Sequence, residues 1–376
     1  MTLLEFRTAP TTLTEELMNP VQAALALRRA KYAYSTRFVF EHEDRASFGV
    51  DTDRTAAPET GDVVLARVAE IGHHKRLEGP GSRRQTLFIG DEIVVAYGSR
   101  YAADQFLATL PKDLGPCNLA AAGGLASEVV EQHDRIDEAT VIEPIGRVTD
   151  AQGKPLNLRD CAPLQIAEAT APTHRVPVIA VLGTSMNSGK STTLACLAHG
   201  LSRAGLRVHT GKATGTGSGN DSHLFTDAGA HHVLDFTDFG LSTTFGLDYG
   251  EVRNVFASLI DELAGNVGEG IPDVVLVEVA DGIYQGETRR LLTDEVFTQR
   301  VDQVVFAAGD ALGAVGGVDV MRSLGHTPTL VSGVLTASPL ATREAMAALD
   351  VPVVATFDLC EPGIGTSFLA NNRVGA

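Results

Sequence analysis

Hydrophobic residues in the first 165 positions occur in short runs that Gly, Pro and Asp separate. Such runs are typical of strands in a small antiparallel barrel or curled sheet. The runs predicted to be strands are 37–41, 61–68, 85–90, 92–97, 139–143 and 145–148. Three segments have helical character instead, namely 13–33 (broken by Pro20), 102–110 and 119–133. We therefore expect a mixed α+β, barrel-like N-terminal domain over residues 1–165, acting as a substrate or lid domain.

The pattern changes to alternating strands and helices after residues 160–175, an alanine- and proline-containing segment that we expect to be a linker. Residues 176–182 form a continuous apolar run, as buried parallel strands do. Residues 191–204 and 252–263 each have one apolar face, as amphipathic helices do. Further strands are predicted at 207–210, 274–279, 304–308, 329–335 and 353–357. This alternation predicts an α/β fold, with a doubly wound C-terminal domain over residues 166–376.

Composition excludes several classes of partner. The 376-residue chain is 44% hydrophobic and 20% charged, with a formal net charge of -17 and no basic stripe, so nucleic acid is not an expected partner. It contains no run of about 18 apolar residues and no basic leader before an apolar core, so we expect neither membrane segment nor signal peptide. Its four cysteines are far apart, which favours reduced thiols in the cytoplasm.

A phosphate-binding motif, Gly183-Thr-Ser-Met-Asn-Ser-Gly-Lys-Ser-Thr192, lies between a predicted strand and a predicted helix. Backbone N–H groups of such a loop surround a phosphate, and the dipole of the next helix favours negative charge. Lys190 is expected to bridge the β- and γ-phosphates of ATP, and the Ser191 hydroxyl to coordinate Mg²⁺. The residues predicted to bind the nucleotide are Gly183, Thr184, Asn187, Ser188, Gly189, Lys190, Ser191 and Thr192.

Charged residues near two other predicted strands are expected to act on the same phosphates. Glu278 ends a strand at the edge where open α/β sheets bind ligands, so its carboxylate is well placed to hold Mg²⁺. Lys212 follows a strand that neighbours the P-loop strand, and the segment 211–219 around it is either an anion-binding loop or a mobile lid. We assign Lys190, Lys212 and Glu278 to catalysis. The second metal carboxylate is predicted to be Asp221; Asp235 and Asp238 compete for that role, although turn and cap formation accounts for them as well.

The motif resembles those of dethiobiotin synthetase, cobyrinate amidase and molybdopterin-guanine dinucleotide protein B, because five residues separate its glycines and Thr184 takes the usual first-glycine position. Lys212 and the segment Val277-Glu-Val-Ala-Asp-Gly282 are similar to segments of the same group. The resemblance covers residues 176–357. Within this group, the chain looks most like an uncharacterised P-loop family that shares its Gly-Thr-Ser-Met loop and its Asp235-Phe-Thr-Asp238 segment. One relative of that broader family is described as a D-glutamate N-acetyltransferase.

The resemblance implies an ATP- and Mg²⁺-dependent enzyme that phosphorylates a small substrate, expected to be a carboxylate, and joins it to an amine in a ligase-type reaction. Two alternatives remain open: a nucleotide-binding accessory NTPase, and an N-acyltransferase that uses the P-loop for the phosphates of coenzyme A. ATP is favoured over GTP because residues 332–336 stand where the guanine-reading Asn-Lys-x-Asp signature would be sought. Ser185 replaces the second lysine of the plasmid-partitioning ATPases, which argues against that branch. Relatives of this type are often dimers, so a homodimer is an open expectation.

Overall fold

Six parallel strands form the sheet of the C-terminal part, in the order β14-β13-β15-β12-β16-β17. The computed structural model describes residues 20–172, 176–265 and 270–370, and this sheet lies in the last two of these ranges. Every residue of β12, β15 and β16 is buried, as expected of parallel strands that are covered on both faces. The strands are β12 (Val178–Gly183), β13 (Val208–Lys212), β14 (His232–Asp235), β15 (Val274–Glu278), β16 (Gln303–Ala307) and β17 (Leu330–Ser332).

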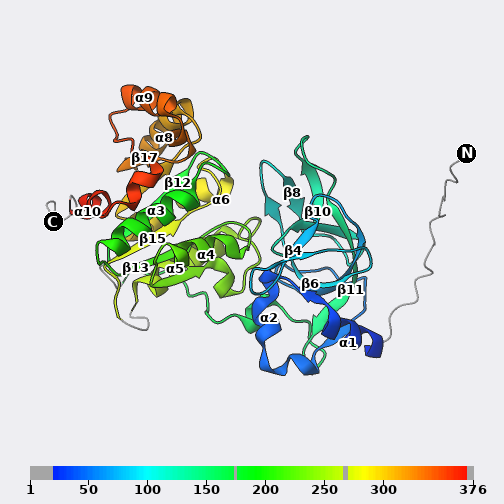
Figure 1. Ribbon diagram of the computed structural model, residues 1–376. Coiled ribbons are helices and arrows are strands. Elements are labelled where there is room, and N and C mark those ends of the chain that lie inside the picture. The colour runs from blue at the N-terminus through cyan, green and yellow to red at the C-terminus, as the bar shows by residue number, and fades with distance from the viewer. Residues whose placement is uncertain (1–19, 173–175, 266–269, 371–376) are drawn as a thin grey trace, which may run out of the picture.

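Helices cover both faces of this sheet (Figure 1). One apolar cluster joins the sheet to α3 and α4, and a second joins its other face to α5, α7 and α8. The helices are α3 (Lys190–Arg203), α4 (Gly219–Asp227), α5 (Tyr249–Ala264), α6 (Gly286–Leu291), α7 (Glu295–Arg300), α8 (Ala311–Ser323), α9 (Pro339–Ala348) and α10 (Pro362–Ala370). This is the doubly wound α/β arrangement that the sequence predicts. No helix among the described residues combines the length and the hydrophobicity needed to cross a membrane.

A nine-stranded, mainly antiparallel sheet forms the N-terminal part, in the order β1-β6-β3-β11-β9-β10-β8-β7 with β2 beside β11. An additional pairing of β6 with β10 closes five of these strands into a ring, so the sheet is curled, as predicted. The strands are β1 (Lys31–Tyr32), β2 (Gly49–Asp51), β3 (Val63–Glu70), β6 (Glu92–Tyr97), β7 (Arg100–Tyr101), β8 (Phe106–Thr109), β9 (Cys117–Ala121), β10 (Leu125–Gln132) and β11 (Thr140–Thr149). A separate hairpin of β4 (Arg76–Glu78) and β5 (Arg84–Thr86) completes this part, with the helices α1 (Pro20–Arg29) and α2 (Arg37–Glu41).

The two helices predicted at 102–110 and 119–133 are wrong. The first segment contains strand β8, and the second contains β9 and β10 joined at Gly123 and Gly124. Gly124 has a φ of 97°, which allows the chain to reverse between the strands. Ala108, Ala120 and Ala126 are fully buried in paired strands, so tertiary pairing overrides their helical preference.

Two predicted strands are also wrong. Residues 37–41 form α2, in which only Val39 is fully buried, so the aromatic and β-branched composition of this segment did not produce a strand. Residues 353–357 make one parallel bridge, between Val353 and Val331, and then a 3₁₀ helix. Of the other predictions, 85–90 contributes only the end of β5, 139–148 forms the single strand β11, and the part of helix 13–33 before Pro20 lies outside the described residues.

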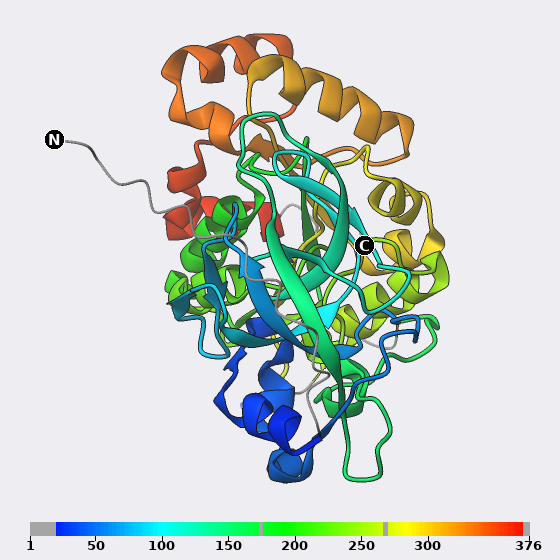
Figure 2. The same ribbon diagram turned by 90° about the vertical axis from the view of Figure 1, so that its right-hand side faces the viewer.

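The two parts lie side by side in Figure 1 and one in front of the other in Figure 2. Polar contacts connect them. Arg37 of α2 forms an ion pair with Asp238 at 2.9 Å, and the Ser242 hydroxyl donates to the carbonyl of Tyr97 at 3.0 Å. Gly123 lies so close to the C-terminal part that a Cβ there would come within 2.0 Å of the Gly217 carbonyl oxygen. The glycine-rich segment around Lys212 is therefore held against the N-terminal sheet.

Candidate functional site

The loop between β12 and α3 has the sharp turns that its glycines predict. Gly189, the residue before α3, has a φ of 95°, and Asn187 has a φ of 61°. A Cβ on Gly183 would come within 2.3 Å of the Ser188 hydroxyl, so only glycine lets the loop fold back over the end of β12. Helix α3 is 14 residues long and begins at Lys190, so its N-terminal N–H groups face this loop.

Lys190 is buried inside the loop, with 6% of its surface exposed. Its ammonium donates to the carbonyl oxygens of Ser185 at 2.9 Å and of Asp281 at 2.5 Å. Burial lowers the pKa of Lys190, and the carboxylates of Glu278 and Asp281 counteract that effect. Carbonyl oxygens are its only hydrogen-bond partners among the described residues, so a phosphate in the loop has a cation available to it.

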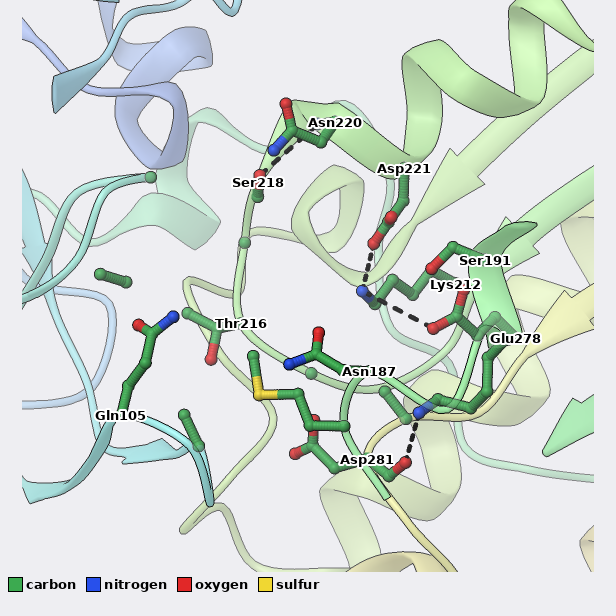
Figure 3. Close-up of a pocket in the computed structure, with 18 of the residues that line it drawn as sticks. Gln105, Asn187, Ser191, Lys212, Thr216, Ser218, Asn220, Asp221, Glu278 and Asp281 are labelled. Atoms are coloured by element: carbon green, nitrogen blue, oxygen red, sulfur yellow. Dashed lines mark hydrogen bonds and ion pairs between the residues drawn. The ribbon is translucent and has the colours of Figure 1, made fainter. Parts of the chain in front are cut away.

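Lys212, Asp221 and Glu278 form a charged cluster beside Ser191 (Figure 3). Lys212, at the end of β13, hydrogen-bonds to Asp221 in the first turn of α4, and its ammonium lies 3.9 Å from Glu278 Oε1 at the end of β15. Burial lowers the pKa of Lys212, but the two carboxylates outweigh it and hold this pKa above its usual value. Burial opposes ionisation of Asp221 too, yet Lys212 keeps the pKa of Asp221 below its usual range.

Glu278 is the most buried member of this cluster, with 2% of its surface exposed. Burial raises the pKa of Glu278, and Lys212 offsets part of that rise. Its Oε2 atom has no hydrogen-bond partner among the described residues, which is costly for a buried carboxylate. The Ser191 hydroxyl lies beside the Asp221 and Glu278 carboxylates and acts to lower the pKa of both.

A hydroxyl and two carboxylates, one of which has an oxygen without a hydrogen-bond partner among the described residues, fit Mg²⁺. The described residues contain no group of three or more His, Cys, Asp and Glu side chains suited to a metal. Mg²⁺ does not need one, because it is usually held by one or two carboxylates and completes its shell with phosphate oxygens and water. Ser191, Asp221 and Glu278 are the residues that would hold it.

A cavity of about 530 Å³ joins the P-loop to the N-terminal part. From the C-terminal part it is lined by Met186, Asn187, the residues 189–192, Lys212, 215–218, Asn220, Asp221, Glu278, Ala280, Asp281 and Val334. From the N-terminal part it is lined by His74, the residues 100–102, Gln105 and 121–123. Figure 3 shows Gln105 across the cavity from Lys212 and Glu278. A ligand in this space would touch both parts of the chain.

The structure brings together most of the residues that the sequence singled out. Asn187, Gly189, Lys190, Ser191, Thr192, Lys212, Asp221 and Glu278 line the cavity; Gly183, Thr184 and Ser188 shape the loop behind it without reaching the lining. Asp235 and Asp238 do not line it. They form a capping box on the 3₁₀ helix Phe236–Phe239, in which Asp235 accepts from the N–H of Thr237 at 2.6 Å and Asp238 accepts from the N–H of Asp235 at 2.7 Å.

The lining residues that the sequence interpretation missed include His74, Arg100, Gln105 and Asp281. Asp281 lies three residues after Glu278 within a segment already singled out, so its position near the strand end was the available signal. His74 stands next to His73, and an adjacent pair of histidines does not by itself indicate a site. Arg100 is one of many arginines, and no motif distinguishes it or Gln105. Their place in the site follows from how the two parts dock, which local spacing does not encode.

Comparison with known proteins found no matching family model and no matching curated protein. Among solved structures, the chain is similar to the signal recognition particle receptor FtsY from Elizabethkingia anophelis, at 19% identity over 58% of this chain and 75% of that chain, with a TM-score of 0.33. It is similar to chloroplast FtsY from Physcomitrella patens at 16% identity over 57% of this chain and 70% of that chain, with a TM-score of 0.35. The Elizabethkingia protein in complex with GDP matches at 18% identity over 52% and 61% of the two chains, with a TM-score of 0.31.

A likeness at these TM-scores says nothing about the activity of this chain. The fold of this chain is instead identified from its own sheet, loop and charged residues. The parallel sheet carries a glycine-containing loop between β12 and α3, a lysine and a serine at the start of that helix, and a carboxylate at the end of the adjacent strand β15. The chain therefore has a P-loop nucleotide-binding fold.

Proposed function

We propose that the protein is an ATP- and Mg²⁺-dependent enzyme that phosphorylates a small carboxylate substrate and joins it to an amine. The observation that carries this proposal is the shared cavity. The P-loop and the Ser191–Asp221–Glu278 cluster open onto a space that the N-terminal part closes on the far side. About 530 Å³ leaves room for a small substrate beside the terminal phosphate, and ligand pockets commonly lie at such junctions.

Each cation of the site has a distinct task in this proposal. Lys190 neutralises the β- and γ-phosphate oxygens from within the loop, together with the backbone N–H groups at the start of α3. In this proposal Lys212 faces the γ-phosphate, where its charge stabilises the transferring phosphoryl group and favours the ionised forms of Asp221 and Glu278. Mg²⁺ bound by Ser191, Asp221 and Glu278 supplies further charge neutralisation on the phosphate oxygens.

The proposed reaction has two steps. A substrate carboxylate oxygen attacks the γ-phosphorus and ADP leaves, which forms an acyl phosphate. The nitrogen of an amine then attacks the acyl carbon, phosphate leaves and the nitrogen loses a proton. The first step needs no general base, because a carboxylate is already ionised at neutral pH. Asp281 is our candidate to accept the proton in the second step, since it lines the cavity and burial raises the pKa of its carboxyl group.

Phosphate release tests this function directly. Purified protein is incubated with ATP, Mg²⁺ and pools of carboxylic and amino acids, and released phosphate is measured with and without each pool. The proposal expects release only when both a carboxylate and an amine are present. Steady release without either would support an accessory NTPase instead. Consumption of acetyl coenzyme A without ATP would support an N-acyltransferase.

A further inference from the structure

Arg100 is a buried cation without a carboxylate partner. It lies in β7, only 6% of its surface is exposed, and it lines the cavity. No carboxylate of the described residues lies within the 4.0 Å that defines an ion pair with it. Burying a charge that is not paired costs several kcal/mol. Such a group is expected to have an anionic ligand.

The hydrogen bonds of Arg100 leave part of its guanidinium unused. Its Nη1 group donates to the carbonyl of Ala120, and Nη2 donates to Gln105 Oε1 at 2.8 Å. Its Nε atom is buried and has no partner among the described residues. A guanidinium has five N–H donors, so one N–H on each Nη group remains beyond these bonds and the buried Nε.

His74 takes up at most one of these donors. Its Nε2 atom lies 2.9 Å from the carbonyl oxygen of Ala120 and 3.3 Å from Arg100 Nη1. Burial, followed by the charge of Arg100, lowers the pKa of His74 to about 3, so the ring is neutral at pH 7. If Nε2 donates its proton to Ala120, it cannot also accept from Arg100. The two side chains then donate to the same carbonyl oxygen, and the neutral ring does not balance the charge of Arg100.

Arg300 shows how a buried arginine with a carboxylate partner is held in this chain. It is 4% exposed, comparable to Arg100, but its Nε and Nη2 atoms donate to the two carboxylate oxygens of Asp261 at 3.0 and 2.8 Å. Asp281 and Asp104 act on Arg100 only through space and do not prevent burial from lowering its pKa to about 10. Arg100 remains positively charged at pH 7.

Gln105, the hydrogen-bond partner of Arg100, marks the side of the cavity on which the proposed ligand would lie. Gln105, which Arg100 contacts, lies across the cavity from the Ser191, Lys212 and Glu278 side chains (Figure 3). The phosphates have Lys190 and Lys212 on their own side. A second anion is therefore expected beside the cavity residues of the N-terminal part. A planar carboxylate suits this position, because its two oxygens match the paired N–H groups of a guanidinium.

We propose that Arg100, supported by Gln105, binds a carboxylate of the non-nucleotide substrate, and that this carboxylate is not the group that is phosphorylated. The inference rests on the proposed function, because it takes the reacting group of the substrate to lie at the γ-phosphate. It specifies a substrate class: small molecules with two carboxylates, one anchored at Arg100 and one directed to the P-loop.

Binding measurements with Arg100→Met and Arg100→Lys test the proposal. The probes are dicarboxylates from malonate to adipate and their amino-substituted forms, titrated by calorimetry in the presence of Mg²⁺ and a non-hydrolysable ATP analogue. At least one should bind the wild type, and Arg100→Met should weaken it about 10- to 100-fold, the range for lost hydrogen bonds to a charged group. Arg100→Lys should recover part of the loss, because it keeps the charge without the fork. The affinity for the ATP analogue should stay within about 2-fold.

Three results would overturn the proposal: no dicarboxylate binds the wild type, the Met variant binds as well as the wild type, or the Met variant loses affinity for the ATP analogue but not for ADP. The last would assign Arg100 to the γ-phosphate. Arg300→Met is the matched control for stability. It leaves Asp261 unpaired and should lower the melting temperature, whereas Arg100→Met should not, because Ala120 keeps its bond from His74.

Failure of the proposed function gives a different result. If the wild type binds a dicarboxylate through Arg100 but releases no phosphate with any amine, the ligase reaction is rejected and the anion site stands.

Discussion

The carboxylate of Glu78 accepts a hydrogen bond from the backbone N–H of Gly219 at 2.9 Å, which joins β4 of the N-terminal part to the first residue of α4. The Ser218 hydroxyl donates to the same carboxylate at 2.9 Å, and Glu78 is 2% exposed. An acidic group at the start of a helix satisfies free N–H donors and interacts favourably with the helix dipole. Because Asp221 lies in the first turn of α4, Glu78 helps to fix a proposed metal ligand.

Glu78→Ala is therefore expected to weaken metal binding as well as stability. Loss of the two hydrogen bonds should cost about 1–3 kcal/mol of unfolding free energy. Mn²⁺ affinity in the presence of an ATP analogue, measured by paramagnetic resonance, should fall several-fold because Asp221 is less well held. His223→Ala is the control, since it removes an exposed contact with Ser82 from the same helix. Equal Mn²⁺ affinity in both variants would show that the contact is only structural.

Lys212→Met leaves Asp221 and Glu278 without their nearest cation. Breaking one side of a buried charge cluster costs about 3–5 kcal/mol, so the melting temperature should drop without metal. Mg²⁺ should then stabilise the variant more than the wild type, because the ion replaces the missing positive charge. Thermal unfolding with and without millimolar Mg²⁺ measures the difference. Lys31→Met breaks a half-buried ion pair with Asp91, so Mg²⁺ should stabilise it no more than it stabilises the wild type. If Mg²⁺ raised the melting temperatures of the wild type, Lys31→Met and Lys212→Met equally, that result would contradict a metal site at this cluster.

The parallel sheet and the P-loop could be predicted because their signals are local. A buried apolar run, a glycine-containing loop and an amphipathic helix follow one another in the chain, and each forms where its own residues indicate. Lys212 and Glu278 could be placed together because the ends of neighbouring parallel strands share one edge. Spacing alone could not choose between Asp221 and the pair Asp235 and Asp238. That choice depends on α4, which brings Asp221 to Lys212.

The side of the cavity that the N-terminal part lines could not be predicted, because it arises from contacts between residues far apart in the sequence. Arg100 and His74 meet at the carbonyl of Ala120 only after the strands of the curled sheet have paired. The same pairing turned the alanine-containing segment 119–133 into two strands rather than the predicted helix.

Lys190→Ala should abolish turnover while the fold is retained. Removing one charge-stabilising group from a phosphate or oxyanion site typically costs about 10²–10³-fold in kcat. Among the described residues its ammonium hydrogen-bonds only to two carbonyl oxygens, so the melting temperature should change little. Lys154→Ala, at an exposed turn of the N-terminal part, is the control and should keep wild-type activity. Undiminished phosphate release by the Lys190 variant would remove the P-loop from the reaction.

Stability at acidic pH should depend on His74. Its folded-state pKa of about 3 lies below its ordinary value of 6.5, so only the unfolded state takes up this proton between those two pH values. The contribution of the neutral ring to the free energy of unfolding is fully present above pH 6.5 and is lost as the pH falls. The loss amounts to about 2 kcal/mol at pH 5. His74→Gln can still donate to Ala120 but does not titrate, so its stability should fall less steeply.

Urea unfolding at several pH values between 7.5 and 5 measures this slope for the wild type, for His74→Gln and for His223→Gln, an exposed histidine. Carboxylates contribute equally to all three proteins, so the difference between the curves isolates the histidine. The His223 variant should follow the wild type. If His74→Gln follows it as well, His74 takes up its proton at the same pH in the folded and unfolded states, and the neutral imidazole beside Arg100 at acidic pH would have to be rejected.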